Sequence, residues 1–184
     1  MAGPFPTWRV PLIFLAMAVI VTGCDSPGER DRVAASASAN RATAFAGDRF
    51  AVQASFLLGD AQLDLREFSL DCKDADEAGR GNIVAAVAGY KLALEHLQAK
   101  LLDTSARYQS LTPPAGFADF DTLFRQALDE QRDGIADAAR RSAQKLPVAE
   151  SLAYLTALSQ TMIDRGSALL SRASAVMPTQ GAAD

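Results

Sequence analysis

Apolar residues recur at spacings of three and four over most of the chain, which is the period of α-helices that bury one face. The clearest run follows the turn Gly79-Arg80-Gly81, with Asn82 as a candidate N-cap. It ends before Pro113, because the residue before a proline is disfavoured in helical geometry. The seam of this helix comprises Ile83, Val87, Tyr90, Leu94, Leu97, Leu101, Thr104, Tyr108 and Leu111, with Thr104 as its one polar member.

Two more helices follow the same pattern. One opens near Gly116 and runs to about Lys145, and Pro147 then suits the first turn of another, which continues to Pro178. The inward positions of the first are Phe117, Phe120, Phe124, Leu128, Ile135 and Ala138. Those of the second are Val148, Leu152, Leu155, Met162, Leu169 and Val176.

The segment before these three helices is less regular. Its heptad-spaced apolar residues are Phe45, Val52, Phe56, Leu63 and Leu70, and they predict a helix that continues to Cys72 with this stripe inward. Gly59-Asp60 could break such a helix, and the residues from 63 to 70 partly alternate as in a strand. A helix is favoured, because a lone strand would have nothing to pair with.

Four helices of about 30 residues with short connections predict antiparallel neighbours. Each helix has one apolar stripe, and only closing the four stripes on one another hides them all from water. The sequence therefore predicts an all-α fold, an up-down-up-down four-helix bundle over residues 47–178, followed by a disordered tail at 179–184.

Small or polar side chains occupy or flank several inward positions of the predicted helices. These are Gly59, Ala127, Gln131, Ala138, Ser142, Ser159, Gly166 and Ala173. They predict either close contact between helices or a polar-lined pocket near Gln131 and Ser159. Close contact is favoured, because helices can approach until empty space is filled.

The N-terminal pattern differs from that of the helices. An uncharged stretch from Val10 to Val21 follows Trp8 and Arg9, and its length is that of the hydrophobic region of a signal peptide. A transmembrane helix needs roughly 20 apolar residues to cross the bilayer. Charged residues resume at Asp25, so the stretch is too short to span a membrane.

The stretch closes with Val21-Thr22-Gly23-Cys24, which resembles the lipobox of bacterial lipoproteins. The resemblance implies cleavage between Gly23 and Cys24 once the cysteine carries a lipid. Cys24 would then be the mature N-terminus, with a thioether-linked diacylglycerol and an amide-linked third acyl chain. The alternative is an ordinary secretory signal in which the cysteine is incidental.

The resemblance also implies a location, the bacterial cell envelope, with the protein held to the lipid bilayer through acylated Cys24. Each buried methylene adds about 0.8 kcal/mol, so two or three acyl chains suffice for stable anchoring. Asp25 resembles the signal that retains enterobacterial lipoproteins at the periplasmic face of the inner membrane. Other bacteria read later positions, which leaves the outer membrane open as an alternative.

Residues 24–46 contain almost no large apolar side chains and predict a flexible tether after the lipidated cysteine. About 20 flexible residues reach some 25 Å, enough to hold a domain clear of the headgroups. The alanine content of this segment leaves a partial helix, beginning after Asp31, as an alternative.

Removal of residues 1–23 from a chain of 184 leaves 161 residues and changes the formal charge from −4 to −5. Such an acidic domain lacks the basic surface that phosphate backbones require, so we expect no nucleic-acid binding. The chain has two cysteines, and lipidation of Cys24 leaves only Cys72, so an intramolecular disulfide is excluded. The helical spacing of Cys72 after Leu65 and Phe68 favours a buried thiol.

His96 is the only histidine and lies beside the seam of its helix. A boundary histidine that reaches water is the favoured interpretation. In the alternative, His96 and Met162 lie at similar heights on parallel helices and together bind a non-covalent haem. Four-helix b-type cytochromes use such a pair, but their ligands lie on the first and last helices.

Acidic clusters give no metal-site pattern. The position three before His96 is Ala93, which excludes the Glu-x-x-His motif of di-iron bundles. Asp71, Asp74, Asp76 and Glu77 lack the central glycine and closing glutamate of an EF-hand loop. A further stripe at every fourth residue has three acids flanked by two bases, Arg125, Asp129, Asp133, Asp137 and Arg141, and is interpreted as a solvated helix face rather than a cation or docking site.

No nucleophile elbow, phosphate-binding loop or catalytic triad pattern occurs in the sequence, and we expect no enzymatic activity. The leading hypothesis is a non-catalytic envelope lipoprotein that presents a helical bundle to a protein partner or gives structural support. The alternative is a small-ligand or haem-binding module that acts as a sensor or carrier. It predicts a void between helices at the level of His96 or Gln131.

Overall fold

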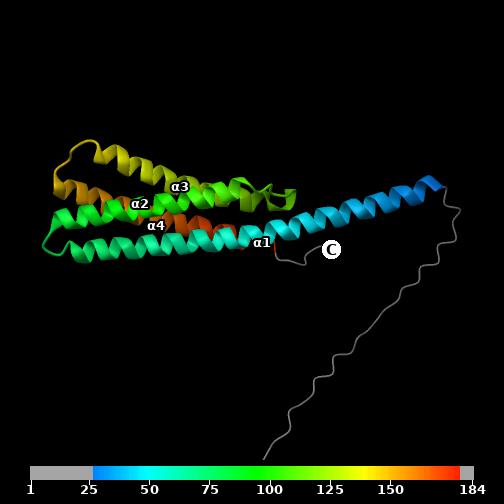
Figure 1. Cartoon of the computed structure of the whole chain (residues 1–184), viewed down its shortest axis with the longest axis horizontal. Helices are drawn as coiled ribbons and strands as arrows, with labels where there is room; N and C mark the ends of the chain where they lie inside the picture. Colours follow the sequence, from blue (N-terminus) through cyan, green and yellow to red (C-terminus); the bar gives the residue numbers. More distant parts are fainter. Residues whose placement is uncertain (1–26, 179–184) are drawn as a thin grey trace, which may run out of the picture. The chain divides into compact units, whose positions relative to one another are not determined.

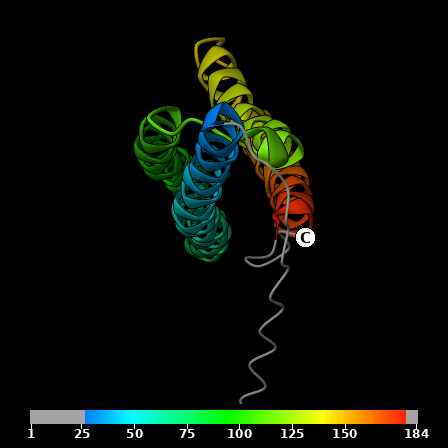
Figure 2. The same ribbon diagram turned by 90° about the vertical axis from the view of Figure 1, so that its right-hand side faces the viewer.

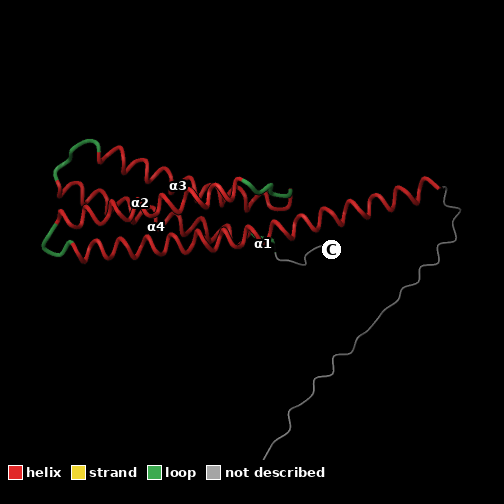
Figure 3. The backbone as a smooth tube through the Cα atoms, in the orientation of Figure 1, coloured by secondary structure: helices red, strands yellow, loops and turns green. Residues whose placement is uncertain are grey.

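The computed structural model describes residues 27–178, so the predicted signal peptide, Cys24, Asp25 and the tail at 179–184 lie outside it. The chain divides into two units, residues 1–38 and 39–184. Its helices are α1 (Pro27–Ala78), α2 (Ile83–Gln109), α3 (Ala118–Ser142) and α4 (Val148–Val176), with a short 3₁₀ turn η1 (Ala115–Phe117) (Figure 1). Over residues 27–178 every regular element is helical, as Figure 3 shows, and the predicted all-α fold is confirmed.

The helices of residues 39–178 form a four-helix bundle in which successive helices run in opposite directions (Figure 1). The α3 helix packs along α4, and α2 contacts both of them. The α1 helix lies beside α2 and α4, as the view along the bundle shows (Figure 2). Short connections leave little choice of topology, which explains why the predicted antiparallel order is the one found.

One end of the bundle is fixed by aromatic rings from three helices and η1. Phe50 of α1 lies 4.8 Å from Phe117 of η1, measured between ring centroids. Tyr108 of α2 lies 4.6 Å from Phe124 of α3, also edge to face. Such pairs add about 0.5–1.5 kcal/mol beyond the area that they bury. The predicted inward positions are therefore confirmed at this end for Tyr108 of α2 and for Phe117, Phe120 and Phe124. At the other end of α2 the prediction for Ile83 is wrong, because it is 47% exposed.

The ends of the helices follow local signals in the sequence. Asn82 caps α2, since its side-chain oxygen accepts a hydrogen bond from the Ala85 amide at 3.1 Å. Gly81 before it has φ +91°, a left-handed conformation that favours glycine. At the start of α4, Pro147 is the N-cap and not a residue of the first turn, a shift of one position from the prediction.

The predicted tether is wrong over most of its length, because α1 begins at Pro27 and continues through residues 28–46 without a break. The helical alternative is the one found, and it starts even before Asp31. Alanine and arginine are among the strongest helix formers and are frequent here, which favours a helix where no packing is required. Gly59-Asp60 does not interrupt α1 either.

The inward face predicted for α1 is also wrong. The heptad-spaced stripe of Phe45, Val52, Phe56, Leu63 and Leu70 is exposed. The opposite face is buried and consists of Phe50, Ala51, Ala54, Leu57, Leu58, Ala61, Leu65, Phe68, Cys72 and Ala75. Four of these residues are alanines, whose small side chains let α1 come close to its neighbours. This helix therefore has two apolar faces, and the bundle uses only one.

Along α4 the predicted heptad is right in the middle and wrong at the ends. Leu155 and Met162 are buried, whereas Val148 and Val176 are exposed. A straight helix drifts by about 20° per heptad relative to a strict seven-residue repeat. Because four repeats separate the two valines, each end of the stripe turns away from the core.

Helices come into close contact at Gly166, one of the small residues predicted near the core, and at Gly134, which was not among those predicted. A Cβ atom on Gly134 of α3 would lie 2.5 Å from the sulfur of Met162. A Cβ atom on Gly166 of α4 would lie 2.9 Å from a methyl carbon of Leu65. Neither position has room for a side chain, so close packing, the favoured interpretation, is confirmed there. Gly59 and Ser142 are exceptions, because both are exposed.

All three tyrosines of the chain donate a hydrogen bond to an aspartate at the edge of the core. The pairs are Tyr90 with Asp76, Tyr108 with Asp121, and Tyr154 with Asp137. Burial, and then the bonded carboxylate, raise the pKa of Tyr90 and of Tyr154 to about 12, and the pKa of Tyr108 is raised as well. The fold therefore favours the neutral phenol.

We expect this preference to cause alkaline unfolding. Between pH 10 and about 12 the unfolded chain loses phenolic protons that the folded chain retains, so the free energy of unfolding falls as the pH rises. A spectrophotometric titration of phenolate should show little signal at pH 10 and then a rise that coincides with loss of helical circular dichroism. The expectation fails if the tyrosines of the folded protein titrate at the ordinary pKa.

Candidate docking surface

The exposed apolar face of α1 is the most distinctive surface of the bundle. We define the outer seam as Phe45, Val52, Phe56, Leu63 and Leu70, which are 72%, 43%, 67%, 52% and 51% exposed. Steps of four and three residues connect these positions through Arg49, Gly59 and Arg66, so that all eight lie on one line along the helix. This line lies on the side of α1 opposite the buried face, so it faces away from the core.

An apolar line of this kind is unusual on a solvated helix. The two phenylalanines alone expose on the order of 250 Å², and apolar patches of several hundred Å² on a monomer commonly mark an interaction site. The alternation of four and three residues is the pattern with which one helix packs against another in a coiled coil. The outer seam therefore has both the chemistry and the spacing of a helix-binding face.

Gly59 at the centre of this line has no explanation within the bundle. A Cβ atom there would find no other heavy atom within 4 Å, so packing inside the chain does not require glycine. Glycine inside a helix costs about 1 kcal/mol relative to alanine. A position that lacks a side chain on an exposed apolar line allows close approach of another backbone or a large side chain.

The outer seam is bordered on one side by ionic contacts between α1 and α2, which we call the ion-pair ladder. The contacts are Arg107 with Asp60 at 2.9 Å, Lys100 with Asp64 at 3.5 Å and with Glu67, and His96 with Asp71 at 3.3 Å. The bond to Glu67 raises the pKa of Lys100. Single surface pairs contribute about 0–1 kcal/mol, and their repetition along one line aligns α1 with α2.

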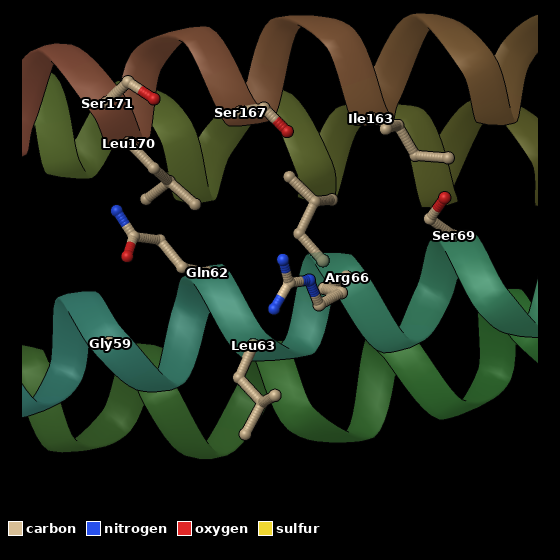
Figure 4. Close-up of a pocket in the computed structure, with 10 residues that line it drawn as sticks. Gly59, Gln62, Leu63, Arg66, Ser69, Ile163, Ser167, Leu170 and Ser171 are labelled. Carbon is tan, nitrogen blue, oxygen red and sulfur yellow. The ribbon is translucent and has the colours of Figure 1, made fainter.

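A groove of about 550 Å³ lies on the other side of the outer seam, between α1 and α4 (Figure 4). The residues that line it are Gly59, Gln62, Leu63, Leu65, Arg66, Ser69, Ile163, Ser167, Leu170 and Ser171. Figure 4 shows Arg66 and Gln62 reaching into the groove, whereas Leu63 points away from α4. Within the described part of the chain, Arg66 has no ion-pair partner. The groove and the outer seam share Gly59, Leu63 and Arg66.

The structure places the two candidate haem ligands in separate surroundings. The side chain of His96 is 56% exposed, and its Nδ1 atom lies 3.3 Å from Asp71 on the surface between α1 and α2. Met162 is buried between α4 and α3, where its sulfur faces Gly134. The two side chains are not brought together. His96 is the boundary histidine that the sequence favoured.

Several acids of the two clusters are paired. Asp129 accepts from Arg132 and Asp137 from Arg140, so that α3 carries its charge stripe as local ion pairs on its surface. Asp76 accepts from Tyr90 at 2.8 Å. Over residues 27–178, no group of three or more histidine, cysteine, aspartate or glutamate residues is placed to hold a metal ion.

Cys72 and the polar core positions complete the predicted candidates. Cys72 is buried, as predicted, and burial raises the pKa of its thiol to about 11 while the Ser159 hydroxyl opposes the shift. Gln131 is 2% exposed, and its amide nitrogen has no hydrogen-bond partner among the described residues. Gly166 beside it is in contact with Leu65, so the helices close around the amide.

In comparisons with protein-family models, with curated proteins and with solved structures, no match to this chain is found. Among the helices of residues 27–178, none is both long and apolar enough to cross a bilayer.

Substitutions on the two faces of α1 should have very different effects. Phe56→Ser combined with Leu63→Ser changes exposed positions, so we expect the free energy of unfolding to change by less than about 1 kcal/mol. Phe68→Ala on the buried face should lower it by about 3–5 kcal/mol, because it leaves a cavity. Urea unfolding at low protein concentration measures both. Equal losses from the two variants would show that the outer seam is part of the core.

Proposed function

We propose that this protein is a lipid-anchored component of the bacterial cell envelope whose helical bundle acts as a non-catalytic docking module. The observation that carries the proposal is the outer seam, an apolar line with coiled-coil spacing that the bundle leaves exposed. The docking partner binds along α1 with a helix of its own. The lipid anchor holds this surface at the membrane.

The anchor is supported by the Val21-Thr22-Gly23-Cys24 motif after a short apolar stretch. With Cys24 acylated, α1 begins only three positions later, at Pro27. The helix that carries the outer seam therefore follows the anchored residue with almost no intervening chain. Asp25 favours the periplasmic face of the inner membrane as the place where the partner is met.

A non-catalytic role is supported by the contacts of the side chains that could take part in a reaction. The only histidine contacts Asp71 at the surface, and the thiol of Cys72 is buried with a raised pKa. The tyrosine hydroxyls are each bonded to an aspartate, which keeps them neutral. These groups contribute to the stability of the bundle rather than to a reaction centre.

Substitution of Cys24 tests the anchor. In cells that express the full chain, Cys24→Ser should abolish incorporation of a clickable fatty acid and move the protein from the membrane to the aqueous fraction, because no other residue is expected to carry acyl chains. Cys72→Ala is the matched control, since it removes the other cysteine and should leave the label and the membrane fraction unchanged. Continued labelling of the Cys24→Ser chain would contradict the proposal.

A photoreactive amino acid in the outer seam tests docking. At position 63, irradiation of intact cells should yield an adduct with a polypeptide of defined mass, because Leu63 lies on the proposed contact line. The same amino acid at Thr161, an exposed position of α4, is the control and should give little adduct. If position 63 yields only lipid adducts, or none, the outer seam is not a protein-docking surface.

A further inference from the structure

The pattern of the outer seam is nearly the same when it is read in either direction. From Phe45 forward, the line shows an apolar residue, Arg49, another apolar residue and then Phe56. From Leu70 backward, it shows an apolar residue, Arg66, another apolar residue and then Gly59. The centre of this symmetry falls between residues 57 and 58.

A surface with such symmetry matches a copy of itself that runs in the opposite direction. In an antiparallel pair centred between residues 57 and 58, Phe45 faces the partner's Leu70 and Val52 faces the partner's Leu63. Two-fold symmetric pairs of this kind are the commonest form of protein self-association, because one patch supplies both halves of the contact. The line from Phe45 to Leu70 covers about 38 Å at 1.5 Å per residue.

At the centre of this pair the largest side chain meets the smallest. Phe56 is 67% exposed, and it faces the partner's Gly59, around which no heavy atom lies within 4 Å. Each pair contains two such contacts, and in each of them the phenylalanine ring fills the space that glycine leaves. This contact accounts for a glycine that costs helical stability and that the bundle itself does not use.

The glycine favours the antiparallel direction, whereas the two arginines do not distinguish between the directions. Within residues 27–178 neither Arg49 nor Arg66 has an ion-pair partner. In the antiparallel pair, Arg49 faces the partner's Arg66, whose neighbour in sequence is Glu67, and Arg66 faces the partner's Arg49, whose neighbour is Asp48. A parallel pair would also place arginine against arginine, and it would place glycine against glycine, which leaves a gap at the centre.

A lipid surface fits the outer seam less well than a second helix. Helices that lie on membranes have a wide apolar face bordered by lysine and arginine, which bind anionic headgroups. The outer seam is narrow, it is flanked by acids such as Asp48, Asp60 and Asp74, and the whole chain has a net charge of −4. These features favour a protein occupant.

We infer that the outer seam binds the outer seam of a second copy of this chain, as an antiparallel helix pair in which Phe56 packs on the partner's Gly59. This inference rests on the proposed docking function and names its occupant. The two bundles then lie on opposite sides of the paired α1 helices, because each buried face points away from the contact.

Cysteine cross-linking in membranes that contain the full chain tests the partner and the direction together. One copy carries Val52→Cys and one tag, and the other carries Leu63→Cys and a second tag. A short bis-maleimide should link them into a dimer that carries both tags. Either variant expressed alone should remain monomeric, because Val52 does not face itself in an antiparallel pair. Thr161→Cys paired with Leu63→Cys is the control.

A bulky residue at the centre gives a second test. Gly59→Leu should reduce the linked dimer at least tenfold, because the side chain occupies the space of the partner's Phe56. The fold tolerates the change, since a Cβ atom at position 59 meets no neighbour, and helical circular dichroism verifies this. An unchanged yield of linked dimer in the Gly59→Leu chain would overturn the inferred contact.

The remaining outcomes distinguish a failure of the inferred pair of copies from a failure of the proposed docking function on which the inference rests. Linking of Val52→Cys copies to one another would show a parallel pair and overturn the inferred direction. No linking, together with a photo-adduct from position 63 to a different protein, would overturn the second copy as occupant and leave the docking function in place. No linking and no protein adduct would overturn both.

Discussion

Burial of the alanine-bearing face of α1 is the constraint on which the other features depend. Ala54 and Ala61 are almost inaccessible to water, and their small side chains let α1 approach α2 and α4 closely. Close approach increases the number of atoms in contact, and dispersion forces and hydrophobic burial both grow with that number. Large side chains in these positions would hold the helices apart. The five apolar residues of the outer seam are thereby left on the outside.

The helix that carries the exposed face is held in place by contacts along one side of that face and by contacts of its buried face at one end of the bundle. The ion-pair ladder aligns α1 with α2, and the aromatic cluster around Phe50 connects α1 to α2, α3 and η1. A partner that binds the outer seam therefore meets a helix that is already formed and already fixed, so the entropic cost of ordering it on binding is small. This matters for a contact built from only five large apolar side chains.

Anchoring and docking reinforce each other in the proposed function. Two proteins confined to one membrane meet at a higher effective concentration than the same proteins in solution, so a weak helix pair can be well populated. A seam with Arg49 and Arg66 in its line is weaker than a fully apolar one, because each charged group loses part of its hydration on burial. These arginines in turn restrict the choice of partner, since a helix with acids next to the matching positions accepts them better than one without such acids.

The sequence by itself determined the number of helices, most of their ends and most core positions of α2 and α3, because helical period, Asn82 and Pro113 act locally. The proposed lipobox at Cys24 also rests on the sequence alone, and it lies outside the described residues. Only the tertiary structure decided which face of α1 is buried. The periodicity shows two apolar faces, but the choice between them depends on how closely α2 and α4 can approach. The partners in the ion-pair ladder, such as His96 and Asp71, could not be predicted from the sequence either, since residues 25 positions apart meet only after α1 and α2 pack.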